Sequence, residues 1–195
     1  MSPDGKILAF VRATPSYDVW IRDLSRGVSA RVTNDGGSET LPVWSADGSL
    51  LAYAVNRDAL GSAIYEKAAS GLTAERLLVR SEAGSFVFPN DWSPEGKHFV
   101  YGSSNSGRMD LDVLSERGGR ATPYLVDGFQ NRSATFSPDR RWLAYTSNES
   151  GVNQVFVRAF PDPAGVKYQV STEGARFHAG AGTDASCSIS TTGVG

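Results

Sequence analysis

Trp44-Ser-Ala-Asp-Gly48, followed one residue later by Leu50-Leu-Ala-Tyr53, is the stretch that decides the fold. An Asp-Gly pair is typical of a tight turn, because Asp bonds to the nearby backbone and Gly accepts a positive φ. The flanking segments are short and rich in aromatic and aliphatic residues, which favours β-strands. We therefore predict two antiparallel strands joined by this turn.

The turn recurs along the chain. The four copies are Ser2-Pro-Asp-Gly5, Ser45-Ala-Asp-Gly48, Ser93-Pro-Glu-Gly96 and Ser137-Pro-Asp-Arg140. They begin 43, 48 and 44 residues apart, and Trp44, Trp92 or Phe136 precedes the last three, whereas Met1 precedes the first. A repeat of about 44 residues that holds several short strands is typical of a β-propeller blade. Met1 stands where an aromatic residue is expected, so the first unit lacks its opening strand.

Each unit also carries two further apolar segments after the turn, as in Val19-Trp-Ile21 and Ala30-Arg-Val32 of the first. No window keeps a helical apolar stripe for three turns. We therefore predict an all-β fold: a partial β-propeller of about four four-stranded antiparallel blades over residues 1–177, with an irregular C-terminal tail over residues 178–195. The aromatic residues beside the turns are expected in the core. They are Trp44, Trp92, Tyr53, Tyr101 and Tyr145.

These units resemble the TolB-like, WD-like propeller repeats of bacteria, in which W-S-P-D-G is followed by L-A-F or L-A-Y. The stretches Tyr145–Pro161 and Tyr168–Thr172 resemble more specifically the propeller that follows the kinase domain and membrane span of many bacterial serine/threonine kinases. Similar blades occur in the periplasmic component of the Tol system and ahead of the hydrolase domain of prolyl-oligopeptidase-like peptidases. The resemblance implies an extracytoplasmic or periplasmic location.

Composition excludes several classes of function. Lys and Arg number 19 and Asp and Glu 21, so the net charge of −2 argues against a general nucleic-acid binder. No run of 18 apolar residues exists, so direct membrane insertion is not expected. A single cysteine, Cys187, excludes an internal disulfide framework and a cysteine-based zinc site.

Catalytic motifs are also missing from the sequence. A kinase needs a Gly-rich loop, H-R-D and D-F-G, and a serine hydrolase of the α/β type needs G-x-S-x-G; none of these occurs. Only two histidines exist, and His98 falls at a strand position occupied elsewhere by apolar residues. We therefore assign no catalytic, cofactor-binding or metal-binding residues and expect no enzyme activity from this chain alone.

The candidate binding residues lie in the loops between the second and third strands of the blades. They are Asn56, Arg57, Asp58, Asn105, Arg108, Asn148 and Glu149. Loops of this kind gather on one propeller face, and function often lies on loops. A protein or small ligand on that face is one interpretation, and ordinary polar turns are the other. The open blade edges are expected to self-associate.

The favoured function is a non-catalytic propeller module for protein or ligand binding, a fragment of a larger bacterial protein such as a membrane-anchored serine/threonine kinase. The alternatives are the propeller portion of a prolyl-oligopeptidase-like peptidase and the Tol-system periplasmic component.

The tail leaves the repeat abruptly after Phe177, where the next aromatic-turn motif is due. One hypothesis is that a nucleotide was lost just after the Phe177 codon. Restoring a C, with suitable synonymous codons, permits the translation FPRWRGDGRELFYL. Its tryptophan falls at position 180 and its D-G pair at positions 183 and 184, in phase with the repeat of about 44 residues. A natural Gly/Ser/Thr-rich disordered tail is the alternative.

The hypothesis of a shifted frame predicts the outcome of resequencing the source DNA. The corrected read should continue through W-x-x-D-G and L-F-Y into further blades, because gradual divergence would erode the aromatic, turn and strand signals separately. An independent read that confirms the present frame would refute the hypothesis.

Overall fold

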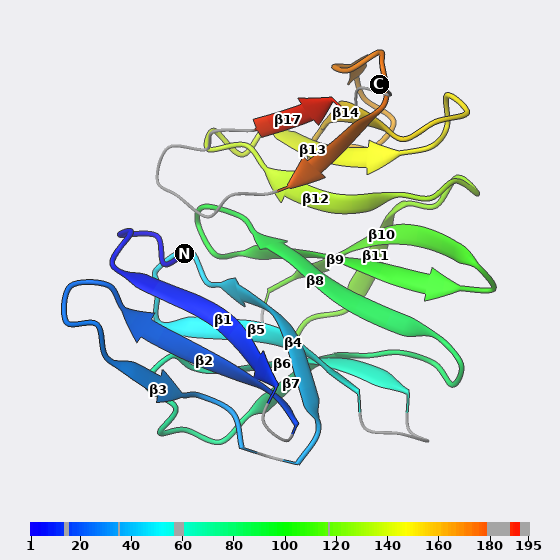
Figure 1. Ribbon diagram of the computed structural model, residues 1–195. Helices are drawn as coiled ribbons and strands as arrows, with labels where there is room; N and C mark the ends of the chain where they lie inside the picture. Colours follow the sequence, from blue (N-terminus) through cyan, green and yellow to red (C-terminus); the bar gives the residue numbers. More distant parts are fainter. Residues whose placement is uncertain (14–15, 35, 57–60, 117, 179–187, 192–195) are drawn as a thin grey trace. The chain divides into compact units, whose positions relative to one another are not determined.

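The computed structural model describes residues 1–13, 16–34, 36–56, 61–116, 118–178 and 188–191, and within them every regular element is a β-strand. The strands form antiparallel sheets, three with four strands (β4-β5-β6-β7, β8-β9-β10-β11 and β12-β13-β14-β15) and one with three (β1-β2-β3), as Figure 1 shows. The predicted partial β-propeller is confirmed. The first blade has three strands, as the place of Met1 at the start of its turn predicts.

The strand bounds follow the repeat. In the first two blades they are β1 Ile7–Ala13, β2 Tyr17–Asp23, β3 Ser29–Arg31, β4 Ser38–Trp44, β5 Leu50–Asn56, β6 Ser62–Ala68 and β7 Arg76–Arg80. In the next two they are β8 Phe86–Trp92, β9 His98–Asn105, β10 Arg108–Ser115, β11 Ala121–Leu125, β12 Arg132–Phe136, β13 Trp142–Ser147, β14 Gln154–Ala159 and β15 Lys167–Gln169. A hairpin of β16 Ala175–His178 and β17 Ser188–Thr191 follows.

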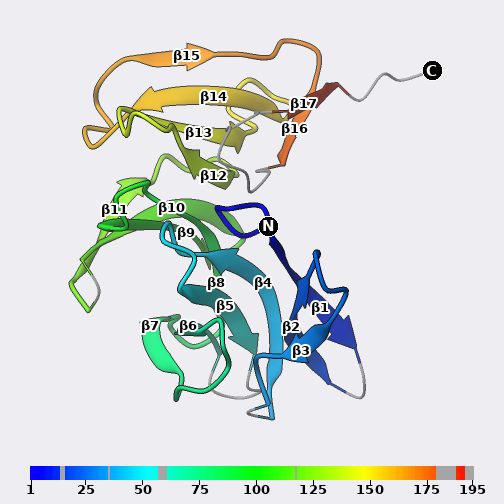
Figure 2. The same ribbon diagram turned by 90° about the vertical axis from the view of Figure 1, so that its left-hand side faces the viewer.

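The chain divides into two compact units, the first mainly Met1–Pro89 and the second mainly Asn90–Gly180. The first unit holds the blades of β1–β3 and β4–β7. The second holds the blade of β12–β15, whose strands follow one another in order in Figure 2, and most of the blade of β8–β11.

The repeated turn is closed by its own side chains. In the second blade, Ser45 Oγ donates to Asp47 Oδ1 at 2.6 Å and accepts the Leu50 N–H at 3.0 Å. The serine hydroxyl accepts the same backbone N–H in the other three units, from Ile7, His98 and Trp142 at 2.9 to 3.0 Å. Serine at the first turn position therefore satisfies the first backbone donor of the following strand, which explains why this residue recurs in all four units.

Each unit buries the sheet faces that its two blades share. In the first unit, Leu51, Tyr53 and Trp44 pack with Val19 and Val32 of the preceding blade. In the second unit, a cluster from both blades includes Phe136, Leu143, Tyr145, Leu111 and Val113. All five aromatic residues predicted for the core are buried, with exposed fractions of 7% or less for Trp44, Trp92, Tyr53, Tyr101 and Tyr145.

The tail differs from the expected irregular segment in five residues, His178 at the end of β16 and Ser188–Thr191. Ser188–Thr191 form β17 and pair with β16, with Phe177 opposite Ile189. The expectation of a tail without strands is therefore wrong for these residues, because Ile189 and Thr191 are β-branched and β16 offers an edge to pair with. β16 itself begins about 44 residues after β12, so the repeat extends to the first strand of a fifth unit. Residues 179–187 and 192–195 of the tail lie outside the described residues.

The fourth turn departs from the other three at Arg140. Its φ is +64°, in the left-handed region that Gly5, Gly48 and Gly96 occupy at the equivalent positions. A side chain in this region is strained. The third turn departs as well, with Glu95 in place of aspartate, and Glu95 Oε2 lies 4.0 Å from Arg140 Nε. Because Arg140 is well exposed, this ion pair offsets only part of the strain.

Replacing Arg140 with Gly should raise the free energy of unfolding by about 0.5–1 kcal/mol, since relief of the left-handed strain exceeds both the lost surface ion pair and the added freedom of the unfolded chain. Urea denaturation measures the change. Arg140→Ala keeps the strain and is the matched control, with no expected gain. Gly48→Ala should lose about 1 kcal/mol, because φ is +71° there and alanine is strained in this left-handed region. Equal stabilities of the Arg140→Gly and wild-type chains would contradict this account.

Asp91 joins the two blades of the second unit. Its Oδ2 accepts hydrogen bonds from the Thr135 hydroxyl at 2.6 Å and from the Phe136 N–H at 2.9 Å, and its Oδ1 accepts the Trp92 N–H at 2.9 Å. Desolvation outweighs these three hydrogen bonds and raises the pKa of Asp91 to about 6. The carboxylate therefore holds β8 to β12 and is also a group whose ionisation opposes folding.

Because the pKa of Asp91 is raised in the folded chain, its contribution to the free energy of unfolding decreases as the pH rises. The folded chain holds this proton more tightly than the unfolded chain, so its stabilising contribution is complete below pH 3.8 and is lost as the pH rises through about 6. Relative to Asp91→Asn, wild type should lose about 2–3 kcal/mol between pH 4 and pH 7. Urea melts of both chains across this range measure the difference, and parallel pH profiles would contradict it.

Candidate binding loops

The loop of the second blade is described only at its ends. Asn56 is the last residue of β5, is exposed, and lies opposite Ser62 at the start of β6. Arg57 and Asp58 lie outside the described residues. For this blade, the binding role of the loop stays a prediction.

In the second unit the candidate residues lie at two strand connections. Asn105 ends β9 and pairs with Arg108, the exposed first residue of β10. Asn148 and Glu149 directly follow β13, and both are half-buried. These two connections belong to adjacent blades.

Gln130 joins these two connections. Its side-chain Nε2 donates to the Gly107 carbonyl at 2.6 Å, and its backbone N–H donates to Asn148 Oδ1 at 2.8 Å. Gln130 and Met109 also form a parallel β-bridge. The backbone and side chain of one residue therefore hold the two loops together. We name Gly107, Arg108, Gln130, Asn148 and Glu149 the Gln130 cluster.

The sequence reasoning missed Gln130 because it lies in a different kind of loop, the one that leads into the first strand of a blade. Its glutamine side chain reaches the neighbouring blade, whereas the predicted loops were chosen within single repeats. The signal available was the polar residues Asp127, Gln130 and Asn131 just before β12.

Glu149 and Asn148 already have partners inside the protein. Glu149 Oε1 lies 2.7 Å from Lys167 Nζ of the outermost strand β15. Asn148 uses its carbonyl oxygen on Gln130, which leaves its amide N–H groups as donors. Gln130, Asn148 and Glu149 are therefore oriented by internal contacts, which lowers the conformational entropy that these side chains would lose on binding a ligand.

Acidic side chains share the strand and the loop of the cluster: Asp110 and Asp112 lie on β10 with Arg108, and Asp127 lies in the loop of Gln130. Asp127 Oδ1 accepts the side-chain N–H of Asn131 at 2.8 Å, and Asp112 Oδ2 accepts the Ser103 hydroxyl at 2.6 Å. Desolvation, together with the charge of Asp127, raises the pKa of Asp110 against the opposing effect of Arg108. Desolvation likewise raises the pKa of Asp112. This part of the unit is rich in hydrogen-bond acceptors, with Arg108 as a nearby cation.

Metal-holding clusters and His98 were the remaining chemical candidates. No group of three or more His, Cys, Asp or Glu side chains among the described residues is arranged to hold a metal ion. His98 lies on β9 with its ring edge against Phe160 at 5.1 Å between centroids, and its Nδ1 lies 3.3 Å from Ser115 Oγ. Within the described part of the chain, no helix is long and apolar enough to span a membrane.

Comparisons with known proteins identify relatives of modest identity. No family model matches the chain. An uncharacterized protein of Agrobacterium fabrum is 27% identical over 161 residues, which are 80% of this chain and 52% of that protein. The uncharacterized peptidase YuxL of Bacillus subtilis is 20% identical over 190 residues, 75% of this chain and 28% of that protein. This chain thus spans about half, or less, of the length of these relatives.

Solved structures have the same fold. TolB from Acinetobacter baumannii superposes with a TM-score of 0.73 at 21% identity, over 89% of this chain and 44% of that chain. Prolyl oligopeptidase B from Galerina marginata superposes with a TM-score of 0.67 at 13% identity, over 91% of this chain and 28% of that chain. At these identities the likeness concerns the fold alone. The described strands therefore form part of a β-propeller, the fold of these solved structures.

Proposed function

We propose that this chain is a non-catalytic β-propeller module that binds a protein or a small polar ligand through the loops of its blades. The observation that carries the proposal is the Gln130 cluster, in which Gln130 hydrogen-bonds to both Gly107 and Asn148 and so joins loops of two blades. The amides of Gln130 and Asn148 and the carboxylate of Glu149 are held by internal contacts, and with the exposed Arg108 they suit recognition of a peptide backbone or a polar small molecule. No nucleic-acid partner is expected at a net charge of −2.

The module belongs, in this proposal, to a larger bacterial protein such as a membrane-anchored serine/threonine kinase, and lies outside the cytoplasm. Support for a larger parent comes from the relatives, which are about twice as long as this chain or longer. Support for the kinase is the sequence resemblance of Tyr145–Pro161 and Tyr168–Thr172. The likeness to TolB is in line with an extracytoplasmic location.

Two other parents have specific support. The likeness to YuxL and to prolyl oligopeptidase B favours the propeller portion of a peptidase, and the likeness to TolB favours a Tol-system component. The coding sequence beside the gene discriminates among them. An upstream kinase domain, a downstream α/β-hydrolase domain or a neighbouring envelope operon each selects one parent.

A displayed library of random peptides supplies a probe for the binding role. Peptides selected on the purified chain should slow amide hydrogen exchange in residues 105–109, 129–132 and 147–153. Arg108→Ala and Gln130→Ala should each weaken these peptides by about tenfold, since a good charged or polar contact is worth about 1.4 kcal/mol or more. Fluorescence anisotropy measures the affinities.

Arg76→Ala is the matched control, because Arg76 lies on the outer strand β7 of the first unit, where it pairs with Glu66. Its peptide affinities should equal those of wild type. Exchange protection confined to outer strands, or equal affinities of all three variants, would contradict the assignment. The same preparation should show neither ATP hydrolysis nor peptidase turnover, and a turnover lost on mutating a described residue would refute the non-catalytic role.

A further inference from the structure

One position of each blade carries a polar side chain directly before a deeply buried apolar residue. The four polar residues are Asp18 on β2, Ser62 on β6, Asp110 on β10 and Gln154 on β14. Three of them have a hydrogen-bond partner: Asp18 Oδ1 accepts Arg31 Nη2 at 2.7 Å, Ser62 Oγ accepts the Val87 N–H at 2.7 Å, and Gln154 Oε1 accepts the Ser171 hydroxyl at 2.6 Å. Asp110 departs from this pattern, since its buried Oδ1 has no partner among the described residues.

The third blade also lacks the hydroxyl that the other blades place near this position. Thr33 Oγ1 accepts the Val19 N–H, Ser81 Oγ accepts the Ser62 N–H and Ser171 Oγ accepts the Val155 N–H, at 2.9 to 3.1 Å. In the third blade, Leu125 pairs with Leu111, and the residue that follows it is Val126. The internal partner that the repeat supplies is therefore missing beside Asp110.

A second acceptor without a partner lies next to Asp110. Asn131 is 0% exposed, and its Oδ1 accepts no hydrogen bond from a described residue. Met109 and Gln130 form a parallel bridge, and the Asn131 N–H donates to the Met109 carbonyl at 2.9 Å. The next residue along each segment, Asp110 or Asn131, therefore lies beside the other with its side chain on the same face. Two buried acceptors side by side are costly unless a donor or a cation joins them.

Asp127 brings a second carboxylate to the same place. Its Oδ1 accepts Asn131 Nδ2 at 2.8 Å, so the Asn131 amide reaches from the face of Asp110 to the Asp127 carboxylate. After desolvation, the charge of Asp127 contributes to the raised pKa of Asp110, against the effect of Arg108. Asp127 is exposed, which leaves a route from solvent to this group of oxygens.

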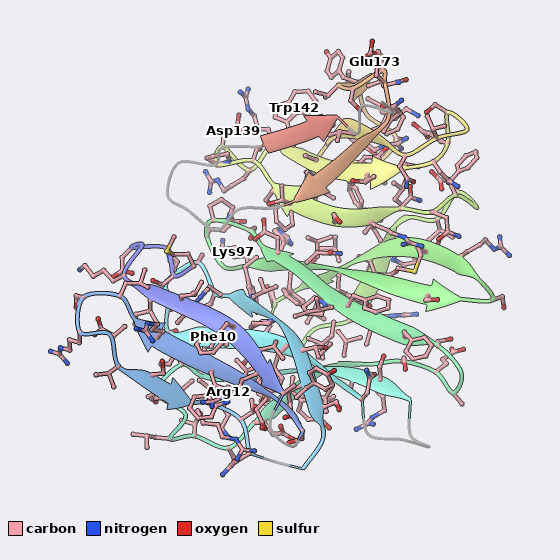
Figure 3. All side chains as sticks on the ribbon, viewed as in Figure 1. Phe10, Arg12, Lys97, Asp139, Trp142 and Glu173 are labelled. Atoms are coloured by element: carbon pink, nitrogen blue, oxygen red, sulfur yellow. The ribbon has the colours of Figure 1, made fainter. Side chains whose placement is uncertain are left out.

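The three side chains lie at the strand ends far from the repeated turns. Figure 3 labels Lys97 and Asp139 beside the turns of the third and fourth blades. Asp110 pairs with Ser103 toward the other end of β9, and Asn131 directly precedes β12, whose far end leads into the turn of Asp139. The same strand ends carry the Gln130 cluster.

We propose that Asp110 Oδ1, Asn131 Oδ1 and the Asp127 carboxylate form a calcium site between β10 and the loop that leads into β12. The unpartnered Asn131 oxygen, held in a fully buried side chain, is the observation that carries the assignment. Carboxylate and amide oxygens are the ligands of Ca²⁺, which accepts irregular geometry and completes its shell with water. The third ligand is an amide, so a search for three acidic or histidine side chains does not find this site.

Calcium also suits the charge of the site. Two carboxylates close to one buried amide oxygen are balanced by a divalent cation, whereas a bound water molecule leaves their charge unchanged. Mg²⁺ is less suited, because it demands a near-octahedral shell at short distances. A bound ion would join β10 to the loop of Gln130, so this loop should become more rigid. The inference stands on these contacts and is independent of the proposed binding function.

Calorimetric titration of the chelator-treated full chain with Ca²⁺ tests the proposal. We expect one site with a Kd of about 0.1–1 mM, the range of calcium sites with few charged ligands. Mg²⁺ should bind at least about tenfold more weakly. Saturating Ca²⁺ should slow amide hydrogen exchange in residues 108–112 and 127–132 by about threefold or more, while β5 and β6 of the first unit stay unchanged.

Asp110→Asn and Asp127→Asn should each weaken Ca²⁺ binding by about tenfold or more, because each keeps the size of the ligand and removes its charge. Asp112→Asn is the matched control. It removes the same charge two positions along β10, but Asp112 Oδ2 accepts the Ser103 hydroxyl and is not a proposed ligand. Its affinity for Ca²⁺ should stay within about twofold of wild type. Asp127 is exposed in a loop, so Asp127→Asn tests the site even if Asp110→Asn does not fold.

Four results would overturn the proposal. They are no saturable Ca²⁺ binding up to about 10 mM, equal affinities for Ca²⁺ and Mg²⁺, equal weakening by Asp112→Asn and the two ligand variants, and exchange protection outside residues 108–112 and 127–132. The third result would mean that Ca²⁺ responds only to the general negative charge of this surface.

Discussion

The packing of one sheet face on the face of the preceding blade is the interaction on which the structure depends. A sheet of three or four short strands cannot bury both of its faces by itself, so each blade is stable only through its neighbours. Leu51 and Tyr53 reach 0% exposure because Val19 and Ile21 lie across from them, and Leu143 and Tyr145 reach it within the cluster of Leu111 and Val113. Removing a neighbour therefore changes the exposure of a whole face, as the half-exposed Leu8 and Phe10 illustrate.

Much of the fold could be predicted from the sequence because both of its determinants are local and repeated. The serine of each turn satisfies the first N–H of the next strand, and the aromatic residue before it packs in the interface between blades. One short motif therefore determines the turn, the register of the two strands and part of the core. The binding loops could be predicted only in part. Gln130 and Asp91 act between repeats, on Asn148 and Thr135 of the next blade, and no pattern within a single repeat reveals such a contact.

Departures from the repeat occur where neighbouring blades meet. Glu95 replaces the usual aspartate and Arg140 the usual glycine, and the two lie beside each other although 45 positions separate them. Asp91 replaces the valine that precedes Trp44, and its carboxylate bonds to the equivalent position of the next blade, Thr135. A repeat protein is approximately a sum of similar units and nearest-neighbour interfaces. Polar substitutions at these positions change the free energy of the interface between two neighbouring blades, so they alter the stability of the pair of blades more than that of either blade alone.

The need to pack each sheet face on a neighbouring blade also decides which parts of a blade can carry polar side chains. The sheet faces are committed to neighbouring blades, and the turn serines to their own strands, which leaves the strand connections as the surfaces where polar side chains can vary without loss of the core. In the second unit these connections hold the exposed Arg108, together with Asn148 and Glu149, which Gln130 and Lys167 orient. Leu8, Phe10 and Trp20 of the first blade are different in kind, since they occupy interface positions of the repeat. The polarity of a position therefore follows its place in the blade: it is apolar where two sheet faces meet and polar where two strands are joined.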